Sequence, residues 1–226
     1  MEDFSDKVFP SITGETNKDW QKKIEEVKEL NIKEIPLFLE RFDKKQREKI
    51  YEVLKDTPIK EIPLVHIRHD MDKEELELLK NRYNSRYFTI HEIGFNYLKE
   101  WSGFEKDLFL EMNTDDKVAK NVKVEEIGGF CVDLAHYQKQ KDRDTVDYEY
   151  VYDRRENEEL FQCNHLSGYS PEKMEDLHFV EKEEDFDYIK KLPSFLFGDV
   201  IGIEIDNPIK EQLEFRRYIL KLLNQR

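Results

Sequence analysis

Carboxylates and histidines stand at the ends of short apolar runs at several places in the sequence. Glu111, Asp133, His165 and Glu204 close such runs, in that order along the chain. A buried carboxylate without a partner costs several kcal/mol, so each acid needs a cationic side chain or a metal ion beside it. Three carboxylates and one imidazole suit Mn²⁺, Mg²⁺ or Co²⁺ and leave coordination positions for a substrate. We therefore predict that these four residues hold a divalent metal ion.

The remaining histidines occupy comparable places. The chain contains six, and besides His165 they lie at or just beyond the end of an apolar run, at His66, His69, His91, His136 and His178. One histidine in such a place is more often a satisfied core or loop residue than a ligand. Acids and a histidine at the ends of four successive strands are harder to explain by packing alone, which favours a shared site.

The elements that must position these residues follow from the apolar pattern. Apolar runs alternate with charged helical stretches at intervals of roughly 20 to 40 residues, which is typical of a series of βα units. Near-continuous apolar runs indicate parallel strands buried on both faces. The predicted strands are 7–13, 35–42, 62–67, 87–91, 107–112, 129–134, 160–166 and 199–205.

Eight βα units within 226 residues predict an α/β fold, a small (β/α)₈ TIM barrel that forms one domain over residues 1–226. The carboxyl ends of barrel strands form the face on which active sites are built, and the candidate residues lie at those ends. An open doubly wound sheet is the alternative, but no glycine-rich phosphate-binding motif follows a strand.

Several helix boundaries can be predicted from capping residues. Residues 44–54 place apolar side chains on one stripe, and Asp72 followed by Glu75 indicates the start of a second helix. Near the C-terminus we expect Asn207 to cap a helix whose first position is Pro208. Residues 138–159 are rich in charge and Tyr, and their pattern fits either a helix or an excursion from the barrel.

The composition limits the classes of protein and partner. Fifteen Phe, 11 Tyr and 2 Trp provide ample core material, and the formal net charge of −14 argues against broad binding to DNA or RNA. The sequence contains neither an 18-residue apolar run nor an apolar signal segment near its start, so we expect a cytoplasmic protein without membrane contact. Cys131 and Cys163 lie in apolar runs outside any CxxC pair, and we expect them to be buried.

From about residue 35 onward, the sequence resembles the xylose isomerase-like TIM barrel superfamily. This superfamily holds sugar and sugar-phosphate isomerases and epimerases together with the endonuclease IV branch (AP endonuclease family 2). The motifs are Leu110-Glu-Met-Asn, Val132-Asp-Leu-Ala-His, Asn164-His-Leu-Ser and Gly202-Ile-Glu-Ile. The resemblance implies the same four metal ligands, with His136 as a contact to substrate or to a second metal.

One further motif, Asp176-Leu-His178, resembles a loop of the trinuclear zinc site in endonuclease IV. In that branch the resemblance implies a larger set of zinc ligands, which comprises His66 or His69 with His91, Glu111, Asp133, His136, His165, Asp176, His178 and Glu204. Similar loops also occur among isomerase-like members, so this motif does not decide between the branches.

The resemblance therefore implies one of two mechanisms. In an isomerase or epimerase, the metal polarises a carbonyl and a neighbouring hydroxyl, while Glu111 and Glu204 act as general bases or acids. Arg68, His91 and His136 would then bind the substrate. In a phosphodiesterase, two or three Zn²⁺ ions generate a hydroxide that attacks a phosphodiester. A third alternative is a barrel that binds metal or a partner without turnover.

The loops that follow the predicted ligands are neutral or acidic, whereas an enzyme that binds duplex DNA surrounds its site with Lys and Arg. We therefore expect a small carbohydrate substrate rather than nucleic acid, and an isomerase or epimerase rather than a phosphodiesterase. The sequence leaves open the identity of the substrate, the number of metal ions and the oligomeric state.

Overall fold

The computed structural model describes residues 3–14 and 17–225, and its centre is a sheet of eight parallel strands. In the sheet the strands follow the order β1-β10-β7-β6-β5-β4-β3-β2. Their bounds are β1 (Val8–Phe9), β2 (Leu37–Phe38), β3 (Leu64–His66), β4 (Tyr87–His91), β5 (Leu108–Glu111), β6 (Gly129–Asp133), β7 (Phe161–Leu166) and β10 (Val200–Ile203). Beyond β1, Ile12 forms a parallel bridge with Leu37, which joins the two edges of the sheet. The strands thus curl into the predicted α/β TIM barrel.

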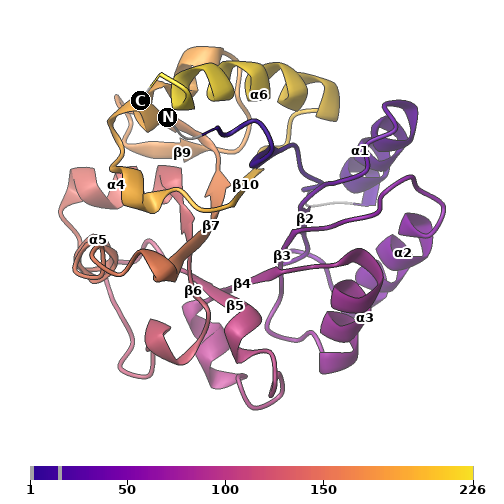
Figure 1. The fold of residues 1–226 in the computed structure, drawn as a ribbon, viewed down its shortest axis with the longest axis horizontal. Helices are drawn as coiled ribbons and strands as arrows, with labels where there is room; N and C mark the ends of the chain where they lie inside the picture. The colour runs from indigo at the N-terminus through magenta and orange to yellow at the C-terminus, as the bar shows by residue number, and fades with distance from the viewer. Residues whose placement is uncertain (1–2, 15–16, 226) are drawn as a thin grey trace.

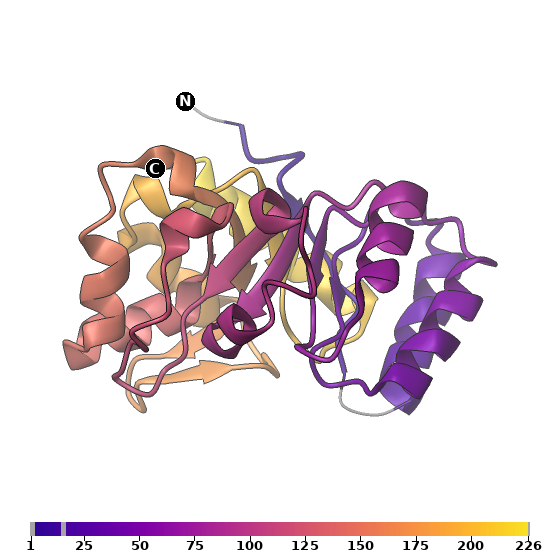
Figure 2. The same ribbon diagram turned by 90° about the horizontal axis from the view of Figure 1, so that it is seen from below.

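Helices surround the strands, as Figure 1 shows. The described α-helices are α1 (Asn17–Glu29), α2 (Lys44–Leu54), α3 (Lys73–Tyr83), α4 (Leu134–Arg143), α5 (Val146–Tyr152) and α6 (Ile209–Leu223). Short 3-10 turns replace an α-helix between β4 and β5 and between β5 and β6. The connection from β7 to β10 contains the hairpin of β8 (Gly168–Ser170) and β9 (Glu175–Leu177), which lies at one edge of the molecule in Figure 2.

Several strands are shorter than the apolar runs that predict them. β1 ends just before Pro10, β2 begins after Pro36, and β3 begins after Pro63. Proline has no N–H to donate to the sheet, so it stands at the ends of these strands rather than within them. β4 spans the predicted residues 87–91.

Two helices begin where they are expected, one of them at a predicted capping residue. The Asp72 side chain accepts a hydrogen bond from the Glu75 N–H at 3.1 Å, and α2 spans the predicted residues 44–54. Residues 138–159 are mostly helical, in α4 and α5. The prediction for the last helix is wrong in detail, because α6 begins at Ile209 and the Asn207 side chain instead bonds the backbone N–H and C=O of Val180.

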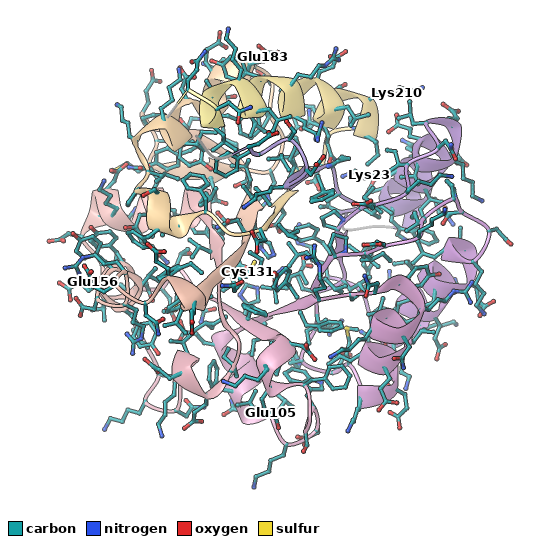
Figure 3. The ribbon with its side chains drawn as sticks, in the orientation of Figure 1. Lys23, Glu105, Cys131, Glu156, Glu183 and Lys210 are labelled. Carbon is teal, nitrogen blue, oxygen red and sulfur yellow. The ribbon has the colours of Figure 1, made fainter. Side chains whose placement is uncertain are left out.

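The interior of the barrel contains apolar side chains, whereas charged side chains lie on its exterior. Cys131 and Cys163 are fully buried, unbridged and register partners on β6 and β7, where they behave as small apolar residues. In Figure 3 Cys131 lies near the centre, whereas Glu105, Glu156, Glu183 and Lys210 lie at the outer rim. None of the described helices is both long and apolar enough to cross a membrane.

Candidate metal centre

The carboxyl ends of neighbouring strands bring the candidate residues together. His91 on β4 is the register partner of Glu111 on β5, and Asp133 on β6 is the partner of His165 on β7. Parallel pairing therefore places these four strand-end residues at one end of the barrel. Among the described residues, histidine and carboxylate atoms gather there into four groups, each with its candidate ligand atoms within 4.8 Å of one another. One of them, His66, His165 and Glu204, combines members of the first two groups described below, so three groups account for all of the residues.

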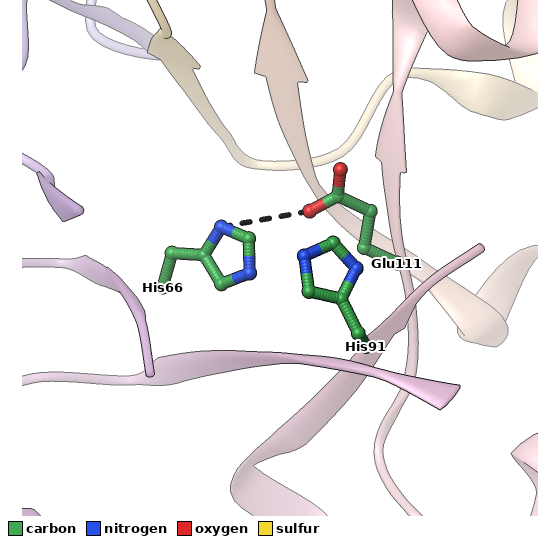
Figure 4. Close-up of side chains that lie close together, drawn as sticks. All are labelled: His66, His91 and Glu111. Atoms are coloured by element: carbon green, nitrogen blue, oxygen red, sulfur yellow. Dashed lines mark ion pairs between the residues drawn. The ribbon is translucent and has the colours of Figure 1, made fainter. Parts of the chain in front are cut away.

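The first group consists of His66, His91 and Glu111, and Figure 4 shows how the two imidazoles approach the carboxylate. His66 Nδ1 lies 3.6 Å from Glu111 Oε2, and the centroids of the two imidazole rings are 4.7 Å apart. All three side chains come from the ends of the adjacent strands β3, β4 and β5. Two imidazoles and one carboxylate are donors that Zn²⁺ accepts readily.

The second group consists of Glu111, Asp133, His165 and Glu204, the four ligands predicted from the sequence. His165 Nδ1 lies 3.0 Å from Glu111 Oε2 and 3.2 Å from Glu204 Oε2. The other ring nitrogen, Nε2, lies 3.2 Å from the Thr89 hydroxyl, which holds the ring in orientation. Glu111 belongs to both of the first two groups and so connects them.

The third group consists of His136, Asp176 and His178, from α4 and from the chain at and just after β9. Asp176 Oδ2 lies 3.6 Å from His136 Nε2 and 3.2 Å from His178 Nε2. Lys139 donates a hydrogen bond to the other oxygen, Asp176 Oδ1, at 2.8 Å. The second nitrogen of His136 lies 3.4 Å from Glu111 Oε1, so this group also adjoins the first two.

Many polar atoms of these groups are buried without a hydrogen bond, although buried polar groups in native proteins are nearly always paired. These atoms are Nδ1 and Nε2 of His66, Nδ1 of His91, His136 and His165, Glu111 Oε2 and Asp133 Oδ2. They are nitrogen and oxygen atoms of the types that coordinate divalent metals. The donor set therefore fits metal ions at this end of the barrel.

Burial and mutual charge shift the pKa values within the centre. Burial alone would raise the pKa of Glu111, but the imidazoles of His165, His91 and His66 outweigh it and hold the pKa well below its usual value. Burial also lowers the pKa of His66 well below its usual value, which favours the neutral imidazole that a metal requires. Burial raises the pKa of Asp133, and the charges of Glu111 and Glu204 add to this effect.

The third group is more exposed and behaves as a set of ion pairs in the absence of metal. Hydrogen bonds from His136 and His178 lower the pKa of Asp176 far below its usual value. The same carboxylate raises the pKa of His178 to about 9. Against the effect of burial, the pKa of His136 is also raised, by Asp133, Asp176 and Glu111, so metal binding to this group would compete with protons for both imidazoles.

Sequence reasoning overlooked Glu40, which lies two residues beyond β2. Its Oε2 atom is buried without a hydrogen bond and lies 3.7 Å from His66 Nδ1. Burial, together with the charge of Glu204, raises the pKa of Glu40 to about 8. The signal was present in the sequence, because Glu40 is a carboxylate within the predicted strand 35–42.

The structure also separates His66 from His69. The ring of His69 packs against Tyr97, with centroids 5.3 Å apart, and His69 belongs to none of the three groups. With Arg68 and Glu40 it lines a cavity of about 200 Å³ that adjoins His91. This cavity offers a place beside the first group for part of a substrate.

No model of a known protein family matches this sequence, and no curated protein matches it. Among solved structures, the chain is similar to a protein described as "Crystal structure of D-tagatose 3-epimerase-like protein". The two share 15% sequence identity with a TM-score of 0.53, over 96% of this chain and 98% of the other. The chain therefore shares with this protein the α/β TIM barrel fold that the sequence predicted.

Proposed function

We propose that this chain is a metal-dependent hydrolase of small phosphodiesters whose centre holds up to three zinc ions. The observation that carries the proposal is that nine side chains at one end of the barrel can be divided into three adjoining groups, two of which share Glu111. A single-metal isomerase requires only one such group. Five imidazoles and four carboxylates also form a mixed nitrogen and oxygen set, which suits Zn²⁺ better than Mg²⁺.

The role of each residue follows from its group. His66, His91 and Glu111 hold the first zinc, Glu111, Asp133, His165 and Glu204 hold the second, and His136, Asp176 and His178 hold the third. Bound zinc ions would supply a hydroxide near neutral pH and would stabilise the charge that develops on the phosphoryl oxygens.

Arg68 is the cation we assign to the phosphate of the substrate. Its side chain is about one third exposed at the cavity beside His91, and within residues 3–14 and 17–225 its ion-pair partner is Asp70, 3.6 Å away. Guanidinium groups bind phosphate oxygens in a bidentate manner. A cavity of about 200 Å³ on a chain with a net charge of −14 favours a small phosphodiester over duplex DNA.

A metal-dependent sugar or sugar-phosphate isomerase or epimerase is the second candidate, and the similarity to a D-tagatose 3-epimerase-like protein favours it. Under this proposal, the second group alone binds Mn²⁺, Mg²⁺ or Co²⁺. Glu111 and Glu204, which approach His165 Nδ1 at 3.0 and 3.2 Å, would then exchange a proton with a carbohydrate.

Metal content and two assays separate the candidates. We expect the purified chain to bind two or three zinc ions and to hydrolyse bis(p-nitrophenyl) phosphate in a zinc-dependent manner. An isomerase or epimerase would instead bind about one Mn²⁺ or Mg²⁺ ion per chain and would incorporate deuterium from D₂O into ketohexoses. A chain that binds no metal after reconstitution would refute both candidates.

A further inference from the structure

A second cluster of acids lies apart from the zinc groups, on segments that the proposed function does not use. Glu92 directly follows β4, Asp115 lies in the loop after β5, and Asp147 lies in the first turn of α5. One carboxylate oxygen from each lies within 4.8 Å of the others. Three segments that are distant in sequence thus direct carboxylates at one point.

The buried member of the cluster lacks a complete set of partners. Asp147 has no exposed surface, and its Oδ2 accepts a hydrogen bond from the Asp116 N–H at 2.8 Å. Its Oδ1 is buried and has no hydrogen-bond partner. A buried carboxylate oxygen without a partner costs free energy, so this atom requires a ligand.

Glu92 is also nearly buried, with 5% of its surface exposed, and its hydrogen bonds are weak. Its two oxygens accept from the N–H groups of Asn113 at 3.3 Å and Ala119 at 3.4 Å, which is longer than is usual for such bonds. Asp115 is exposed, so one member of the cluster is in contact with solvent. The arrangement has two buried acids beneath one exposed acid.

Among the described residues, no Lys or Arg side chain neutralises this charge. Within residues 3–14 and 17–225, no Lys or Arg nitrogen forms an ion pair with Glu92, Asp115 or Asp147. Burial raises the pKa of Asp147 to about 6, and the like charges of Glu92 and Asp115 add to the effect. Near neutral pH the cluster therefore contains carboxylates that repel one another, and two of the three are buried.

We propose that Glu92, Asp115 and Asp147 form a binding site for a Ca²⁺ ion, separate from the zinc groups. Carboxylate oxygens are the donors of a hard cation, and the cluster offers no imidazole or thiolate that would favour zinc. Oxygens within 4.8 Å of one another fit around Ca²⁺, whose bonds to oxygen are about 2.3 to 2.6 Å long. Mg²⁺ requires shorter bonds and a stricter octahedron, which three side chains from separate segments meet less easily.

The bound ion would connect the segments that directly follow β4 and β5, the two strands that carry His91 and Glu111. Glu92 follows His91 directly, and the loop with Asp115 begins just after Glu111. Gln140 of α4 also donates a hydrogen bond to the Asn113 carbonyl in this loop at 2.6 Å. Ca²⁺ would therefore stabilise the fold around β4, β5 and α5 without contacting the substrate.

The test is a titration of CaCl₂ into the zinc-loaded full-length protein, followed by calorimetry and thermal unfolding. We expect one Ca²⁺ per chain and a rise in Tm of about 5 to 10 °C at a concentration 100 times the Kd. Asp147→Asn should abolish both responses while the zinc content stays unchanged. The matched control Asp56→Asn, at an exposed position two residues after α2, should respond as the wild type does.

A further variant separates this site from the zinc centre. Glu111→Gln alters the zinc groups but should keep the full response to Ca²⁺, so failure of the zinc proposal does not affect this test. The calcium site would be refuted by a wild-type chain that binds no Ca²⁺, by an unchanged response in Asp147→Asn, or by binding of Mg²⁺ in preference to Ca²⁺.

Discussion

Glu111 is the side chain on which the proposed zinc centre most depends, and the substitution Glu111→Gln tests it. Its oxygens lie 3.0 Å from His165 Nδ1, 3.6 Å from His66 Nδ1 and 3.4 Å from His136 Nδ1. Glutamine keeps the size and shape of the side chain but removes the negative charge and one ligand from two groups. The third group, with Asp176 at its centre, keeps all of its members.

The expected magnitude follows from this sharing. Loss of a residue that merely supports a metal ligand weakens binding about 10- to 100-fold, so loss of the shared ligand should weaken each affected site by at least about 1.4 to 2.7 kcal/mol. With free zinc held about tenfold above the wild-type Kd, occupancy of such a site falls from about 90% to between about 10% and 50%. Summed over the two affected sites, the zinc content should therefore fall by about 0.8 to 1.6 ions per chain.

The assay is elemental analysis of the protein after dialysis against a zinc buffer, with circular dichroism to show that the variant is folded. Glu156→Gln, an exposed carboxylate on the outer rim, is the matched control and should keep the wild-type zinc content. If folded Glu111→Gln keeps all of the zinc found in the wild type, Glu111 does not connect two metal sites and the proposed centre is wrong.

Three further predictions concern turnover, substrate binding and pH. Glu204→Gln should lower kcat at least about 100-fold while circular dichroism stays unchanged, and activity near the wild-type level would remove Glu204 from the site. Arg68→Ala should raise KM for the phosphodiester about 10- to 100-fold with a smaller change in kcat, whereas the exposed control Arg217→Ala should leave KM unchanged. In calcium-free buffer, the pKa of Asp147 is raised from its ordinary value of 3.8 to about 6 in the folded protein. The protonated side chain therefore stabilises the fold fully below about pH 3.8, and this stabilisation is lost as the pH rises through about 6. Urea unfolding of the wild type should therefore show a loss of up to about 3 kcal/mol across this window that Asp147→Asn lacks, and equal pH profiles would contradict the shift.

The similarity in fold to a D-tagatose 3-epimerase-like protein does not extend to the reaction, and the proposed zinc groups have to be judged on their own residues. A barrel is a scaffold whose strand ends accept many sites, so fold alone does not determine the reaction. Five additional residues distinguish the proposed centre from a single four-residue group, namely His66, His91, His136, Asp176 and His178. Activity assays with metal analysis are therefore more informative than further comparison of folds.

Much of this protein could be predicted from the sequence. The alternation of apolar runs with charged helices indicated the barrel, because parallel strands buried on both faces need continuous apolar residues. The positions of Glu111, Asp133, His165 and Glu204 at the ends of those runs indicated a common site, because parallel strands present their carboxyl ends to one face. Both inferences depend on the local order of apolar and charged residues and on the parallel arrangement of strands in a barrel.

Other features depend on contacts between distant segments, and only the tertiary structure decided them. His66 and His69 are both near the end of β3, yet only His66 lies within reach of Glu111. Asn207 binds the backbone of Val180 rather than capping a helix, because the loop before α6 packs against that segment. Asp147 meets Glu92 and Asp115 only because α5, the turn after β4 and the loop after β5 converge, and neither local periodicity nor residue type records such an approach.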